Sequence, residues 1–139
     1  MVTRKLRRWR DRGAAAVEFA LVVPVLILLI FGSIEFGLAV QARTMVGNAA
    51  REGVRVASLG GSVAEVQTSA LNALGTVSGA KTVTVTCKTP SGTSCVIGAA
   101  NPGNVATVVV TVNYTGITGM FPQLTNTLLK ASSYMRIEG

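Results

Sequence analysis

Two cysteines have the spacing that most directly predicts chemistry in this sequence. Cys87 and Cys95 flank the stretch Lys-Thr-Pro-Ser-Gly-Thr-Ser, whose central Pro-Ser-Gly favours a turn. Cysteines at the two ends of a tight hairpin form a disulfide when the segment lies outside the cytoplasm. We therefore predict a structural Cys87–Cys95 disulfide, worth at most about 3 kcal/mol for so short a loop. A pair of free thiols and a redox-active pair are the alternatives.

Glu18 is a carboxylate at the start of a long apolar stretch, five residues after Gly13. Burying an ionised carboxylate there costs several kcal/mol unless it is paired. In the simplest interpretation Glu18 lies at the lipid headgroup level, hydrated and without a special role. Glu18 follows closely after a basic leader, residues 1–13, and this position favours a functional role instead.

Catalytic side chains are scarce. The chain has no histidine and only six acidic residues, which are scattered without an obvious pair. It contains no glycine-rich phosphate loop and no cluster with metal-ligand spacing. We predict that the protein is not an enzyme and binds neither a cofactor nor a metal.

The apolar stretch runs from Ala14 to Val40, with Glu18 and Glu35 as its only charged residues. As a helix it is about 40 Å long, enough for a hydrocarbon core of about 30 Å. Pro24 can kink such a helix without preventing it from spanning a membrane. The basic leader predicts a cytoplasmic N-terminus and places everything after Val40 across the membrane.

The formal charge of +7 does not predict a nucleic-acid partner, because it is concentrated in the leader. Without the first twelve residues the chain carries about +2. No second basic patch is interleaved with aromatic residues, as a single-strand groove requires.

The helical pattern continues past the membrane and stops at Gly60-Gly61. A shorter helix follows, with Ser62 as its N-cap, Glu65 completing a capping box and Gly75 at its end. The period then changes to two. Strands are predicted at Lys81–Cys87, Val105–Tyr114 and Leu128–Ile137, with a short one around Cys95–Ile97 that pairs back on the first.

These elements predict an α+β fold: a long N-terminal transmembrane helix that continues into a small pilin-like head with a short helix and an antiparallel sheet. The domain organisation is a basic leader peptide over residues 1–13, the transmembrane and extended helix over 14–60, and an exported head over 61–139.

Around the glycine the sequence resembles a known family. The string Arg12-Gly13-Ala14-Ala15-Ala16-Val17-Glu18-Phe19 resembles the class III prepilin processing site. The stretch RGAAAVEFALVVPVLILLIFGSIEFG is similar over its whole length to the TadE-like pseudopilins of tight-adherence (Tad/Flp, type IVc) pilus systems. The later stretch NAAREGVR resembles their post-membrane helix, whereas the head carries no comparable signature. The major Flp pilin shares the cleavage site but is shorter and lacks such a head.

The resemblance implies a minor pilin that acts in Tad pilus assembly. A prepilin peptidase would cut between Gly13 and Ala14, leaving Glu18 as the fifth residue of the mature chain, followed by the aromatic Phe19. The Glu18 carboxylate would then pair with the freed amine of a neighbouring subunit, which offsets part of the cost of each charge in the bilayer. The implied partners are the peptidase, other pilins and pseudopilins of the machinery, and the inner membrane, with possible incorporation into a surface pilus.

Three alternatives remain open at this stage. The first is an uncleaved, signal-anchored envelope protein with an exported structural or adhesive head. The second is a secretory protein cleaved near Val40-Gln41-Ala42, although that site lies far beyond the apolar run. The third is an exported enzyme.

Overall fold

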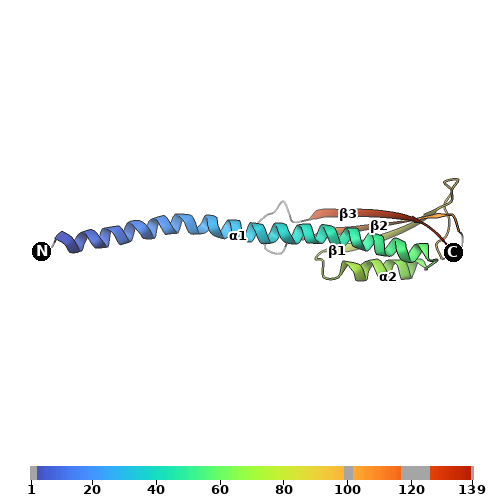
Figure 1. Cartoon of the computed structure of the whole chain (residues 1–139), viewed down its shortest axis with the longest axis horizontal. Coiled ribbons are helices and arrows are strands. Elements are labelled where there is room, and N and C mark those ends of the chain that lie inside the picture. The colour runs from blue at the N-terminus through green and yellow to red at the C-terminus, as the bar shows by residue number, and fades with distance from the viewer. Residues whose placement is uncertain (1–2, 99–101, 117–125, 139) are drawn as a thin grey trace. The chain divides into compact units, whose positions relative to one another are not determined.

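The structure, a computed structural model, describes residues 3–98, 102–116 and 126–138, with side chains described from residue 13 onward. The chain divides into two compact units, Met1–Phe36 and Gly37–Gly139, and each is described by itself. In chain order the described elements are α1 (Thr3–Ser58), α2 (Val63–Leu74), β1 (Ala80–Lys88), β2 (Val105–Tyr114) and β3 (Thr127–Arg136) (Figure 1). The predicted α+β fold, with a long apolar N-terminal helix, a short helix and an antiparallel sheet, is confirmed.

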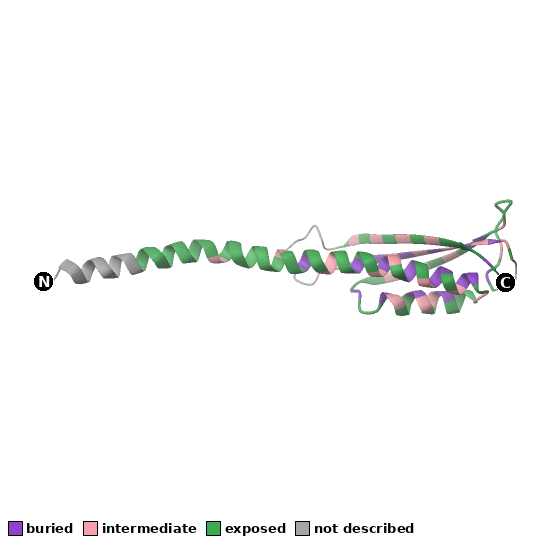
Figure 2. Ribbon diagram, viewed as in Figure 1, coloured by how far each residue is buried: buried purple, intermediate pink, exposed green. Residues whose placement is uncertain are grey.

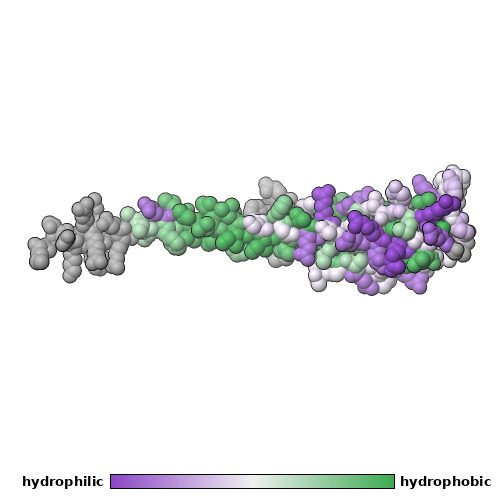
Figure 3. All heavy atoms as spheres, in the orientation of Figure 1, coloured by the Kyte–Doolittle hydropathy of each residue, from purple (hydrophilic) through white to green (hydrophobic). Residues whose placement is uncertain are grey.

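The first unit is formed by the N-terminal part of α1. The helix begins at Thr3 rather than after the leader, because the basic leader is rich in good helix formers and contains no proline. It also continues through Pro24. Large apolar side chains are exposed along the helix from Val17 to Phe36. Figure 3 shows this stretch as a largely hydrophobic surface on the side in view, and Figure 2 colours most of its ribbon as exposed. The mean hydropathy of its most apolar window is 2.7. By length and composition this helix could span a membrane.

The second unit, the head, begins with the C-terminal part of α1. One stripe of that helix is buried, at three- and four-residue spacings that place its members on a single face. Gly53 lies at the tightest point, because a Cβ there would be 3.1 Å from Val108 Cγ1 and 3.2 Å from Ala70 Cβ. The buried residues of the stripe are Ala42, Val46, Ala49, Ala50, Val54 and Ala57.

The short helix α2 has the N-terminus that the sequence predicts. The Glu65 amide donates to Ser62 Oγ at 3.4 Å, and the Ser62 amide donates to Glu65 Oε2 at 2.8 Å, so both halves of the capping box are present. Gly75 ends the helix. Its buried face consists of Val66, Ala70 and Leu74, and Gln67 Nε2 donates to the Val83 carbonyl of β1 at 3.2 Å.

The sheet is three-stranded and antiparallel, in the order β1-β2-β3. On the inner face of β2 every second residue is fully buried, from Ala106 to Tyr114. Val108 of that face meets the α1 stripe at Gly53. The core is therefore a sandwich of two helices on one face of a sheet.

Two details differ from the sequence prediction. Residues 95–97 form no strand; Lys88 and Ser94 make an isolated bridge instead. Ile97 is buried and Gly98 turns at a φ of +97° close to Ser62, so this segment folds into the core rather than along β1. The last strand is shifted by one residue, because Ile137 leaves the sheet to pair with the backbone of Asn104 and Gly103.

Candidate functional site

The sequence-predicted processing and assembly residues lie together on α1. Gly13, Ala14, Glu18 and Phe19 are all exposed, Phe19 with 69 % of its surface accessible. Ala14 and Glu18 are four residues apart, which is about 6 Å of helical rise and close to one turn. The segment is thus continuous helix in which the glycine, the small residues and the carboxylate all face solvent or lipid.

Gly13 is not required by local packing. A Cβ built at this position meets no atom within 4 Å. Glycine inside a helix costs about 1 kcal/mol relative to alanine. Among the described residues, no contact therefore accounts for a glycine at position 13.

Glu18 has no ion pair or hydrogen bond among the residues whose side chains the structure describes. Its carboxylate is exposed, and its flanking neighbours Val17 and Phe19 are large, exposed and apolar.

The burial of Glu35 is not predicted by the sequence pattern, in which it is only one of two charged residues of the apolar stretch. Glu35 is 1 % exposed and has an interaction partner. Its spacing could have revealed this, because Glu35 lies two helical turns before Ala42, the first residue of the buried stripe. A buried charge is retained only when it is paired.

The cysteine hairpin lies at the end of β1. Cys87 and Cys95 are joined in a disulfide, with their Cα atoms 5.0 Å apart. The Cys95 amide donates to the Cys87 carbonyl at 3.1 Å. Between them the Thr93 amide donates to Thr89 Oγ1 at 3.1 Å, and Gly92 adopts a φ of +86° that favours glycine. Cys87 itself is buried, so the disulfide closes this edge of the core.

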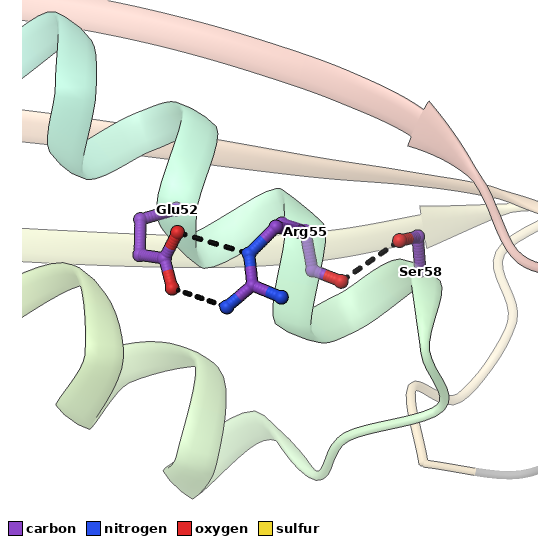
Figure 4. Close-up of polar contacts among 3 residues, drawn as sticks. All are labelled: Glu52, Arg55 and Ser58. Atoms are coloured by element: carbon purple, nitrogen blue, oxygen red, sulfur yellow. Dashed lines mark hydrogen bonds and ion pairs between the residues drawn. The ribbon is translucent and has the colours of Figure 1, made fainter.

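An open groove of about 640 Å³ lies between α1 and α2 in the head. Its two carboxylates are already engaged. Glu52 accepts from Arg55 Nη2 at 2.7 Å and from Arg55 Nε at 3.0 Å, which lowers the pKa of Glu52 (Figure 4). The Ser62 backbone amide likewise lowers the pKa of Glu65. Among the described residues no group of three or more His, Cys, Asp or Glu is placed to hold a metal ion.

Residues 13–55 match the family model of the TadE-like proteins. No curated protein and no solved structure matches the chain significantly. The matched segment begins at Gly13 and includes Glu18, Glu35 and the first part of the buried α1 stripe. The resemblance seen in the sequence is therefore confirmed, and the chain is TadE-like over residues 13–55.

Proposed function

We propose that this protein is a minor pilin, or pseudopilin, that acts in the assembly of a Tad (Flp, type IVc) pilus and has no catalytic activity of its own. Before assembly a prepilin peptidase cuts the bond between Gly13 and Ala14. The leader stays in the cytoplasm, the apolar part of α1 crosses the inner membrane, and the head lies outside. Its partners are the peptidase and other pilins and pseudopilins of the same machinery.

Gly13 is the observation that carries the proposal. The family match starts at this residue, and no described contact requires a glycine there. A peptidase needs a small residue with an accessible backbone at the bond it cuts, and Gly13 is exposed. The catalytic groups belong to the peptidase, so this chain needs none for the step.

Gly37 provides a matched control for a test of processing. It lies in the same helix, and its Cβ would also meet nothing within 4 Å. We expect Gly13→Leu to remain at full length and Gly37→Leu to be processed like the wild type, in a strain that carries the peptidase. N-terminal sequencing of the membrane-bound protein decides the matter. A wild-type chain that still begins at Met1 or Val2 contradicts the proposal and supports an uncleaved signal-anchored protein.

Glu18 provides the test of assembly. Cleavage frees an amine on Ala14, and the exposed carboxylate one turn further along is placed to pair with such an amine on a neighbouring subunit. Glu18→Gln keeps the shape and removes a charge that costs up to about 3 kcal/mol in the bilayer. We therefore expect normal processing and membrane level, but few or no pili. Glu138→Gln, an exposed carboxylate in the head, should leave piliation unchanged. Normal piliation with Glu18→Gln defeats the assembly role.

A further inference from the structure

The sheet of the head has one face that no described element covers. We call it the outer sheet face; it consists of the alternate residues of each strand that point away from α1 and α2. On β1 and β3 these residues are exposed, and on the central β2 they are half-buried, as expected for a sheet open on one side. The inner positions of β2 are buried instead. One face of the sheet is therefore left uncovered by the elements that the structure describes.

Three cations lie on the outer sheet face. Val105 of β2 pairs with Lys88 on one side and with Arg136 on the other, so these two side chains are about 10 Å apart across the sheet. Lys130 lies six residues before Arg136 on β3, about 20 Å along the strand. The carboxylates that the structure describes all lie elsewhere: Glu18, Glu35 and Glu52 on α1, Glu65 on α2, and Glu138 after β3. The face is positively charged without an internal counter-charge.

Between the cations the face is lined with hydroxyl groups. Thr84 and Ser132 flank Val109, and Thr82 and Lys130 flank Thr111 in the same way. Tyr134 presents an aromatic ring that is 77 % exposed. The small hydroxyl side chains of the face are Thr82, Thr84, Thr86, Thr107, Thr111 and Ser132.

We propose that the outer sheet face is a docking surface for an acidic polysaccharide. Carboxylates on the polymer pair with Lys88, Lys130 and Arg136, because none of the carboxylates that the structure describes lies on this face. Hydroxyl groups of the protein both donate and accept hydrogen bonds, as sugar hydroxyls do, and the exposed Tyr134 ring offers an apolar face for a sugar ring to pack on.

The same observations disfavour two other anionic partners. Single-stranded nucleic acid needs several aromatic side chains on which successive bases stack, and Tyr134 is the only aromatic residue among the outward positions of the described strands. A bilayer surface is bound by a basic patch together with apolar side chains that insert into it. The outer sheet face has mainly hydroxyl groups between its cations.

The test uses the full chain in detergent micelles and immobilised polygalacturonate, with neutral dextran as the uncharged probe. Lys88→Gln/Lys130→Gln removes two cations of the face. Arg43→Gln/Arg51→Gln removes two exposed arginines of α1 and gives the same net charge. We expect the first double variant to bind polygalacturonate about two- to thirty-fold more weakly, as for the loss of two exposed ion pairs, and the second to bind like the wild type. Tyr134→Ala should also weaken binding, whereas Tyr134→Phe should not.

Equal losses in the two double variants would mean non-specific attraction by net charge and would overturn the proposal. So would the absence of binding to polygalacturonate, or binding to dextran of equal strength.

Vesicles of phosphatidylglycerol, single-stranded DNA and polyglutamate serve as competitors. If any of these displaces the protein at a lower concentration of charge than soluble polygalacturonate does, the partner is of that other class. The proposal does not depend on cleavage at Gly13, so either proposal can fail without the other.

Discussion

Two glycines of α1 allow the packing of the head to be tested by the same substitution with opposite results. Gly47 and Gly53 lie six residues apart in one helix. A Cβ at Gly47 meets nothing within 4 Å, whereas at Gly53 it lies 3.1 Å from Val108 Cγ1 and 3.2 Å from Ala70 Cβ. Carbon atoms prefer separations of about 3.5–4.0 Å. Val108 and Ala70 are both fully buried, and the Ala70 Cβ is fixed to its backbone, so neither can move away easily.

The magnitude follows from two opposing effects. Replacing a helical glycine by alanine stabilises by about 1 kcal/mol at either position. Overpacking a core costs about 1–3 kcal/mol, and only Gly53→Ala incurs it. Gly47→Ala should therefore raise the stability of the head by about 1 kcal/mol. Gly53→Ala should lie about 1–3 kcal/mol below Gly47→Ala, because the helix-propensity gain cancels in the comparison.

Thermal melting of the full chain in detergent measures the difference. The near-ultraviolet circular dichroism of Tyr114, which is 4 % exposed, reports on the core of the head, whereas the apolar part of α1 stays helical in detergent and dominates the far-ultraviolet signal. For a domain of this size 1 kcal/mol shifts the Tm by about 4–8 °C. We expect Gly53→Ala to melt at least about 4 °C below Gly47→Ala. If it melts at the same temperature or higher, the close approach of α1 to β2 is wrong.

Three further predictions concern the sites. Cys87→Ser/Cys95→Ser should lower the free energy of unfolding of the head by up to about 3 kcal/mol. In the denatured wild-type protein, the two thiols should be labelled only after reduction. Full labelling without reductant contradicts the disulfide. The Ser62 amide lowers the pKa of Glu65 from its usual 4.5, so the ionised Glu65 carboxylate stabilises the head fully above pH 4.5 and loses this effect as the pH falls toward the folded pKa. The stability advantage of the wild type over Glu65→Gln should therefore shrink below pH 4.5. A constant stability difference down to pH 3 argues against the capping role. Gly13→Ala, unlike Gly13→Leu, should still be processed at a measurable rate, because it keeps a small residue at the bond; mass spectrometry of the mature chain distinguishes the two.

The apolar helix, the capping box and the strands could be predicted from the sequence because each depends on local pattern. In a membrane, the apolar run from Ala14 to Val40 is expected to form a spanning helix. Ser62 and Glu65 contact each other within a single turn, and the alternation in β1 and β2 is a property of the strands themselves.

The features that the sequence did not predict depend on residues far apart in the chain. The burial of Glu35 follows from its seven-residue spacing to the buried Ala42, which a count of charges does not register. The turn of residues 95–97 into the core depends on the position of Ser62, more than thirty residues earlier. The close packing at Gly53 depends on how both α2 and β2 are positioned against α1. The outer sheet face depends on the pairing of β1 and β3 with β2, because its cations come from these two outer strands.

The end of the chain has a consequence for how the head folds. Ile137 is 1 % exposed and pairs with Asn104, and the next amide, that of Glu138, donates to the Ser58 carbonyl at 3.0 Å. The last residues thus close against the end of α1, which leaves the ribosome some eighty residues earlier. Contacts of such large separation form slowly, because the intervening chain must be ordered first. The buried stripe of α1 therefore emerges before α2 and β2, the elements that cover it at Gly53, have been made. Until they are made and packed, the stripe is an exposed apolar surface that is prone to aggregation. Loss of Ile137 and Glu138 would therefore remove the hydrogen bond to Ser58 at the end of the first helix.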